Sequence, residues 1–206
     1  MPEKFEDHLS KVKGAIRRVN INNDFVRKRD ISTYYWNNAS DLNSAALVIW
    51  NACYGKDSTL TPQMLGLGKG FSFSASLPPV FAFLAGLSLE LSLKAIAKIL
   101  GRPFKATHQL NDLCNSVGIS VTVDQQALLD MFTEHIYWRS RYPVPRREGE
   151  WLRSLEVFRK ALKRPKAGSL FSAVNENCVI NLENYLVLWS KFADAYWQAK
   201  SVILEP

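Results

Sequence analysis

The chain has 206 residues, of which 47% are hydrophobic and 22% are charged, and its formal net charge is +7. These values exclude a wholly disordered chain and suit one globular domain with a substantial core. We find no secretory signal and no run of the roughly 20 apolar residues that cross a bilayer, so we expect a cytoplasmic protein without membrane contact.

The sequence of the first 79 residues predicts two helices and a loop. Amphipathic spacing indicates a helix over residues 2–19 and a longer, aromatic-rich helix over 31–54. Gly, Ser and Pro dominate 55–79, which we expect to be a long loop. This loop contains neither GxGxxG nor GxxxxGK[ST], so a phosphate-cradling loop of those types is not supported.

The next segment raises the choice between a strand and a helix. Leucines alternate from residue 87 to 93, as in a strand, but the apolar run from Pro79 to Leu100 is too long for a typical strand. Its Ala, Leu, Glu and Lys residues favour a helix, which Pro79 suits at the start and Gly101 at the end. On that helix, Glu90, Lys94 and Lys98 form one polar stripe, as expected for the central helix of a bundle.

The second half predicts further helices. One is expected to begin at His108, and the capping-box pair Thr122 and Gln125 opens another that runs to about Trp138. Its inner face is expected to hold Leu128, Phe132 and Ile136, and Pro143 and Pro145 stop it.

Two helices complete the prediction, one basic over 150–163 and one over 176–203. The last shows an apolar row of Leu182, Leu186, Trp189, Phe192 and Tyr196. No strand is strongly indicated, so we predict a single all-α domain, a helical bundle, over 1–206.

Positive charge is concentrated in one segment. From Arg139 to Lys166 there are ten Arg and Lys against three Glu, whereas the rest of the chain holds 16 of each sign. Such a segment attracts phosphate-bearing partners, although a solvated helix face beside a loop is the alternative. The candidate nucleic-acid surface consists of Arg146, Arg147, Lys163, Arg164 and Lys166.

The cysteines indicate the redox environment. Cys53, Cys114 and Cys178 are odd in number and have no paired spacing. They fit buried thiols in a reducing cytoplasm better than disulfides or a zinc site, so we expect no metal and no cofactor.

Two segments together resemble a known family. LAGLSLELSLKAIAKILGRPFKATHQLNDL (84–113) is followed by YWRSRYPVP (137–145). Glu90 and Lys94 one turn apart, then Thr107-His108-x-Leu110-x-x-Leu113, then Arg141-Tyr142-Pro143 resemble the HEPN superfamily of nucleotide- and RNA-associated helical domains. The resemblance covers about 84–145.

The resemblance implies an antiparallel four-helix core, at about 79–203 here, and commonly a homodimer. It also implies roles in RNA cleavage, RNA processing, nucleotide binding or prokaryotic defence and toxin systems, with a nucleotidyltransferase or an antitoxin as a partner. Ribonucleases of the family use Arg-x4–6-His near the start of a late helix, and no histidine follows Arg139 or Arg141 here. Arg102 and His108 have that spacing but fall in the connection between two helices, and they remain the candidates for catalysis.

The polar residues of the central segment have two interpretations each. Glu90 and Lys94 form either an inter-helix polar network or a ligand contact. His108 either binds phosphate or acts as an acid or base, or it is a capping or core histidine bonded to Glu90. His135 falls at the edge of an apolar face, and we expect a core residue.

Arg141 and Tyr142 are also open to two interpretations. Arg141 could bind a carboxylate or phosphate while Tyr142 stacks on a base. Alternatively, Arg141 braces Glu90 and ties two helices together.

Three hypotheses follow. The first is a nucleotide- or RNA-binding module that uses the basic segment 139–166, with Lys94, His108 and Arg141 lining a cleft. The second is a metal-independent ribonuclease that uses Arg102 and His108. The third is a dimeric helical scaffold whose polar residues are only structural.

Overall fold

The computed structural model describes residues 31–56, 60–104, 107–160, 176 and 179–204, and these contain helices and no strand. The all-α prediction is therefore confirmed for the described part of the chain. The elements are α3 (Ser32–Tyr54), the 3-10 helix η1 (Pro62–Leu65), α4 (Phe73–Ser76), α5 (Pro78–Ile99), α6 (Leu110–Val117), α7 (Val123–Glu134), the π-helical turn η2 (His135–Arg139), α8 (Glu148–Lys160) and α9 (Leu182–Leu204). The helix expected at 2–19 lies outside the described residues.

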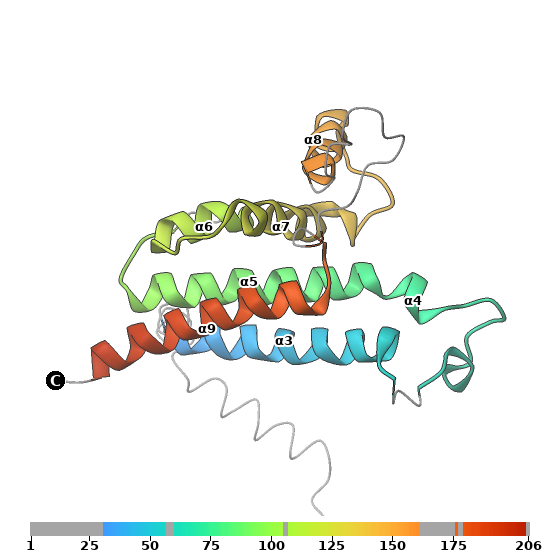
Figure 1. Ribbon diagram of the computed structural model, residues 1–206, viewed down its shortest axis with the longest axis horizontal. Coiled ribbons are helices and arrows are strands. Elements are labelled where there is room, and N and C mark those ends of the chain that lie inside the picture. The colour runs from blue at the N-terminus through green and yellow to red at the C-terminus, as the bar shows by residue number, and fades with distance from the viewer. Residues whose placement is uncertain (1–30, 57–59, 105–106, 161–175, 177–178, 205–206) are drawn as a thin grey trace, which may run out of the picture.

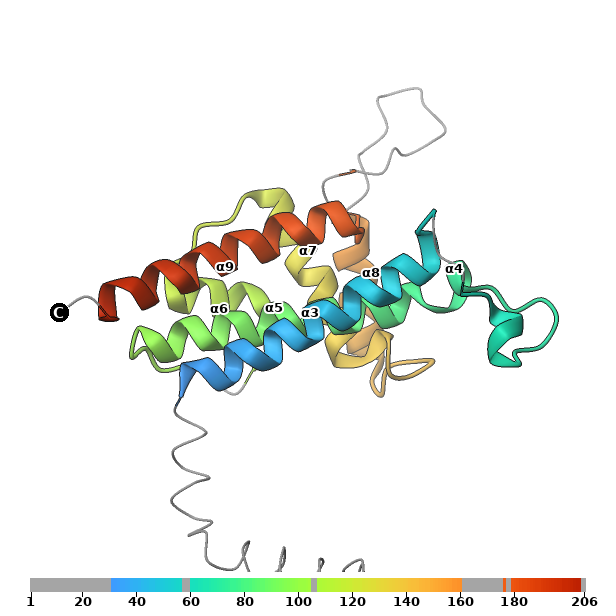
Figure 2. The ribbon, with the colours of Figure 1, turned by 90° about the horizontal axis from the view of Figure 1, so that it is seen from below.

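The long helices are arranged around α5. In Figure 1, α6 and α7 cover one side of α5, and α3 and α9 cover the other. α8 lies on the outer side of α7, farthest from α3. Figure 2 shows α3 and α9 lying along α5, and the loop that contains η1 projecting beyond the end of the bundle. α5 is therefore covered by long helices on two opposite sides.

α5 begins and ends within one residue of the predicted bounds, Pro79 and Leu100. Pro78 stands at its first position, and Gly101, just past its end, has a φ of 62°, which glycine adopts without strain. Twelve of its residues are buried, including Glu90. The alternation of leucines is thus part of a helix that is apolar nearly all round.

One expectation about α5 is corrected. The helix is long and apolar enough to cross a membrane, contrary to the expectation that no stretch is. However, 67% of the apolar stretch is buried inside the protein, and it packs against α3, α6 and α9. That burial is what a central core helix shows.

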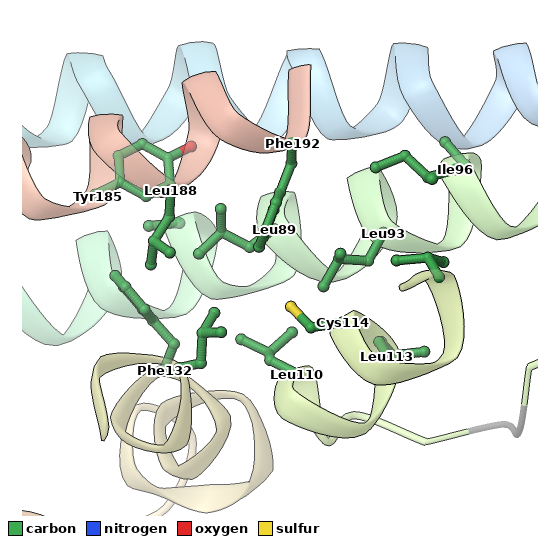
Figure 3. Packing of buried hydrophobic residues seen from close by; sticks show 14 of the residues in the cluster. Leu89, Leu93, Ile96, Leu110, Leu113, Cys114, Phe132, Tyr185, Leu188 and Phe192 are labelled. Atoms are coloured by element: carbon green, nitrogen blue, oxygen red, sulfur yellow. The ribbon is translucent and has the colours of Figure 1, made fainter. Parts of the chain in front are cut away.

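The core joins both sides of α5. Figure 3 shows side chains of α9 on one side and of α6 and α7 on the other meeting around Leu89 and Leu93. These include Leu110, Leu113, Cys114, Phe132, Tyr185, Leu188 and Phe192. The predicted inner face is confirmed, because Leu128 and Phe132 of α7 and Ile136 of η2 are buried.

The buried face of α9 matches the predicted row at Phe192 and Tyr196, which are fully buried, and differs from it nearer the start of the helix. Tyr185 and Leu188 are fully buried, whereas Leu182 and Leu186 are only partly buried. The reason is a polar anchor, since the Tyr185 hydroxyl lies 2.7 Å from Asn43 Oδ1 on α3 and 3.2 Å from Ser88 Oγ on α5. These bonds turn that face of α9 toward α5.

The start of α7 follows the predicted capping box. Gln125 N lies 3.2 Å from Thr122 Oγ1, and Thr122 N lies 3.1 Å from Gln125 Oε1. After Glu134 the α-helix widens into η2, where Ser140 N donates to the His135 carbonyl five residues back. The helix thus ends at Arg139, ahead of the prolines expected to stop it.

Some boundaries are corrected. The expected loop 55–79 contains η1 and α4. The helix expected at His108 begins at Leu110, whose N–H donates to Thr133 Oγ1 at 3.2 Å. Cys53 and Cys114 are free thiols, and burial raises the pKa of Cys114 to about 12. Cys178 lies outside the described residues.

Candidate functional site

The first part of the site is the buried carboxylate of Glu90, in the middle of α5. Lys94 Nζ lies 2.5 Å from Oε1, and Nδ1 of His108, in the connection before α6, lies 2.8 Å from Oε2. The Glu90 side chain is only 4% exposed, so both oxygens are satisfied inside the protein. The polar network is therefore present, and it ties the connection before α6 to α5.

His108 is fixed on a second side by α7 and η2. Its carbonyl accepts from Thr133 Oγ1 at 3.4 Å, and its ring meets Tyr137 edge-on with 5.4 Å between ring centres. When Glu90 is ionised, Nδ1 must donate to it, and Nε2 is then the nitrogen that is not bound to the carboxylate. The imidazole is 47% exposed, so His108 combines a fixed orientation with access from solvent.

A second buried carboxylate, Glu134 at the end of α7, was missed by the sequence analysis. Its Oε2 accepts from Trp138 Nε1 at 2.9 Å, and its Oε1 accepts from Arg153 Nε at 3.1 Å. The Glu134 side chain is 3% exposed, whereas that of Arg153 is 47% exposed. This carboxylate ties α8 to α7.

Tyr137 lies between the two carboxylate clusters. His108 contacts its ring from the α5 side, and the Arg153 guanidinium carbon lies 5.8 Å from its centre. One aromatic ring thus joins the partner of Glu90 to the partner of Glu134.

Beyond Tyr137 is a pocket of about 330 Å³ between η2, the turn after it and α8. Its lining residues are Tyr137, Trp138, Arg141, Tyr142, Arg146, Glu150 and Arg153. The guanidinium carbons of Arg141 and Arg146 each lie 5.4 Å from the Tyr142 ring centre, a cation–π distance. Three arginines and two tyrosines therefore surround one space.

The predicted ligand residues are divided between these parts. Arg141, Tyr142 and Arg146 line the pocket, and His108 contacts it through Tyr137. Glu90 lies behind them in the core. Among the described residues, no bond joins Arg141 to Glu90, so the proposed brace between them is not observed.

Arg102 is separated from His108. Its Nη1 donates to the Ser116 carbonyl at 3.3 Å, at the C-terminal end of α6, whereas His108 precedes the N-terminal end. A helix of eight residues is about 12 Å long, so the two side chains lie at opposite ends of it.

The remaining predicted residues lie away from the pocket or outside the described residues. His135 is a satisfied core residue, because it is buried and its Nδ1 lies 2.7 Å from Ser140 Oγ. Burial and the nearby Arg139 charge lower its pKa to about 4. Arg147 is exposed, and Lys163, Arg164 and Lys166 lie outside the described residues.

The side chains that line the pocket are of the types that bind anions and planar rings. Guanidinium groups donate to phosphate or carboxylate oxygens, and tyrosine rings stack on planar ligands. Within the described ranges, no group of three or more His, Cys, Asp or Glu residues could hold a metal ion.

Comparison of the chain with protein-family models, with curated proteins and with solved structures finds no match.

Proposed function

We propose that this chain is a HEPN-like protein that binds nucleotides or RNA, in a prokaryotic defence, toxin–antitoxin or RNA-processing system, with a nucleotidyltransferase or an antitoxin as a partner. One observation carries the proposal: three guanidinium groups and two tyrosine rings line one pocket of about 330 Å³. Arginine forks match phosphate oxygens and aromatic rings match bases, so a nucleotide satisfies both kinds of group.

One guanidinium group of the pocket is held in place, and all three have donors available. Arg153 uses its Nε on Glu134, which fixes the side chain. Among the described residues, Arg153 makes no other side-chain hydrogen bond, and Arg141 and Arg146 make none. A pre-organised donor such as Arg153 loses little freedom when an anion binds.

The fold part of the proposal is a HEPN-type antiparallel four-helix core. It includes α3 in addition to the expected 79–203, because Trp36 of α3 stacks on Tyr196 of α9 with 4.3 Å between ring centres. We also propose a cytoplasmic homodimer, which the exposed Trp151 (41%) and Trp197 (51%) favour. Sedimentation showing only monomer at micromolar concentration would remove the dimer.

The test is binding of a labelled single-stranded RNA, measured from about 50 to 200 mM salt. Replacing Arg141 and Arg146 together with alanine should lower the affinity at least tenfold. It should also reduce the slope of log affinity against log salt, by about 0.7 for each phosphate that these two arginines contact. The matched control is Arg159→Ala on α8, because Arg159 is 78% exposed and lies outside the pocket. Equal RNA affinity in the pocket variant and the control would overturn the proposal.

A metal-independent ribonuclease is the second candidate, and the Glu90–His108 bond favours it. A carboxylate on Nδ1 orients the imidazole and leaves Nε2 to accept or donate a proton. Arg102 has no part in this version, because it lies at the other end of α6. His108→Ala should abolish cleavage of a mixed RNA pool while Arg102→Ala retains it. Absence of cleavage by the unmodified protein would remove this candidate, and absence of RNA binding as well would leave the dimeric scaffold.

A further inference from the structure

Among the described residues, Glu150 is the only acidic one that lines the pocket with Arg141, Arg146 and Arg153. It lies in the first turn of α8 and is partly buried. Among the described residues, its carboxylate makes no hydrogen bond and no ion pair, even with these three guanidinium groups. The pocket therefore offers cationic donors and one anionic acceptor that do not neutralise each other.

The cations are held away from Glu150 by other groups. Arg153, one turn further along α8, is bound to the buried Glu134. Arg141 and Arg146 lie at cation–π distance from Tyr142. A ligand that uses the whole pocket must carry an anion for the arginines and hydrogen-bond donors for Glu150.

A ribonucleotide has these groups at short separation. Its phosphate and its 2′- and 3′-hydroxyls lie on either side of one sugar ring, whereas the polar edge of a base lies farther from the phosphate. The volume of about 330 Å³ is at the lower end for small-molecule sites and suits a single nucleotide. A carboxylate that accepts from ribose hydroxyls is a known means of nucleotide recognition.

The carboxylate also restricts which nucleotide fits. An internal nucleotide of RNA carries a second phosphate on O3′, which would be placed beside Glu150 and repelled by its charge. A terminal nucleotide with a free 2′,3′-diol avoids that repulsion and donates to the carboxylate instead.

We propose that the pocket takes a terminal ribonucleotide with a free 2′,3′-diol, and that Glu150 accepts hydrogen bonds from that diol while the arginines hold the 5′-phosphate. This inference rests on the proposed nucleotide- or RNA-binding function. The same chemistry is present in a free nucleoside monophosphate and at the 3′ end of an RNA, and the experiment separates the two.

The experiment compares a short 5′-labelled RNA ending in a 3′-hydroxyl with the same RNA ending in a 3′-phosphate. The unmodified protein should bind the hydroxyl form about tenfold more tightly, the effect of one hydrogen bond to a charged group. Glu150→Gln should remove this preference. Glu148→Gln is the matched control, because Glu148 lies in the same turn, is exposed and does not line the pocket.

A second arm uses free AMP and its 2′,3′-dideoxy analogue in calorimetry. Preference for AMP, without binding of either RNA, supports the diol and identifies a free nucleotide as the ligand. Equal binding within both pairs of ligands overturns the role of Glu150 but leaves the proposed function. No binding of any of the four ligands at low salt overturns both.

Discussion

Two buried glutamates, one in the middle of the bundle and one at its edge, are bound in the same way. Each accepts from the residue four positions ahead on its own helix. Each also accepts from a side chain of the next segment, 18 positions ahead for Glu90 and 19 for Glu134. In both places the carboxylate fixes a following segment onto the helix that carries it.

The two clusters differ in what they bury. Glu90 holds Lys94, which is only 13% exposed, so a second charge is largely removed from water. Glu134 holds the neutral indole of Trp138, and its cationic partner Arg153 is 47% exposed. The same local arrangement therefore braces the core in one place and positions a solvent-accessible cation in the other.

The largest expected effect tests this difference directly. Glu90→Gln should lower the free energy of unfolding by about 3–5 kcal/mol, because it leaves Lys94 largely buried without its anion. Glu134→Gln should cost only about 1–2 kcal/mol, since Arg153 can turn to water and the amide oxygen still accepts from Trp138. Urea unfolding of both variants measures the losses, and equal losses would contradict the division into core and edge.

The next expected effect is a change of stability with pH, and it concerns only the edge of the bundle, where His135 lies in η2. Burial lowers the pKa of His135 to about 4, so the unfolded chain binds a proton near pH 6.5 that the folded protein excludes. Stability should therefore fall as the pH drops from about 6.5 to 4, by about 3 kcal/mol from this group. Urea unfolding at several pH values should show a shallower loss for His135→Gln than for the unmodified protein. Parallel curves would show that His135 does not control this range.

A smaller effect is expected from a change in the spacing between α5, in the core, and η2, at the edge. A Cβ atom on Gly86 of α5 would lie 3.0 Å from Ile136 Cγ1 and 3.3 Å from the Phe132 carbonyl oxygen. Gly86→Ala should therefore cost about 1–3 kcal/mol, as overpacking does, and should displace η2. Thermal melting gives the loss, and RNA affinity should fall with it because Tyr137 belongs to η2. Gly149→Ala is the control, since a Cβ there meets no atom within 4 Å.

The smallest effect separates stability from binding. Thr122→Ala removes the cap of α7, far along the helix from Glu134, and should cost about 1 kcal/mol. RNA affinity at 25 °C should stay unchanged, because the cap touches no pocket residue. A fall in RNA affinity in this variant would show that any loss of helix stability disturbs the pocket. A lower affinity of the Arg141 and Arg146 variant would then not be evidence of direct contact.

The sequence predicted the core side of this comparison well. Helical spacing placed Glu90 and Lys94 on one stripe, and the apolar length around them indicated a buried helix. The capping box at Thr122 was also visible, because it depends on residues three positions apart. Interactions within one or two turns of a helix are readable from spacing alone.

The edge was harder to predict. Glu134 looked like an ordinary polar residue near a helix end, since its second partner lies 19 residues away across a turn. One signal was available: Trp138 stands four positions ahead, and a buried indole N–H requires an acceptor. The change from α7 to η2 had no comparable signal in the sequence. That change determines the directions in which Tyr137 and Arg141 face.

The π-helical turn at 135–139 makes the pocket sensitive to chain length. A turn of this kind accommodates more residues than an α-helical turn, and each residue of an α-helix advances the direction of the side chains by about 100°. Deleting one residue here, so that an ordinary helix forms, would swing Arg141 and Tyr142 by about a quarter turn and away from α8. A single-codon deletion would thus dismantle the pocket without replacing any of its side chains.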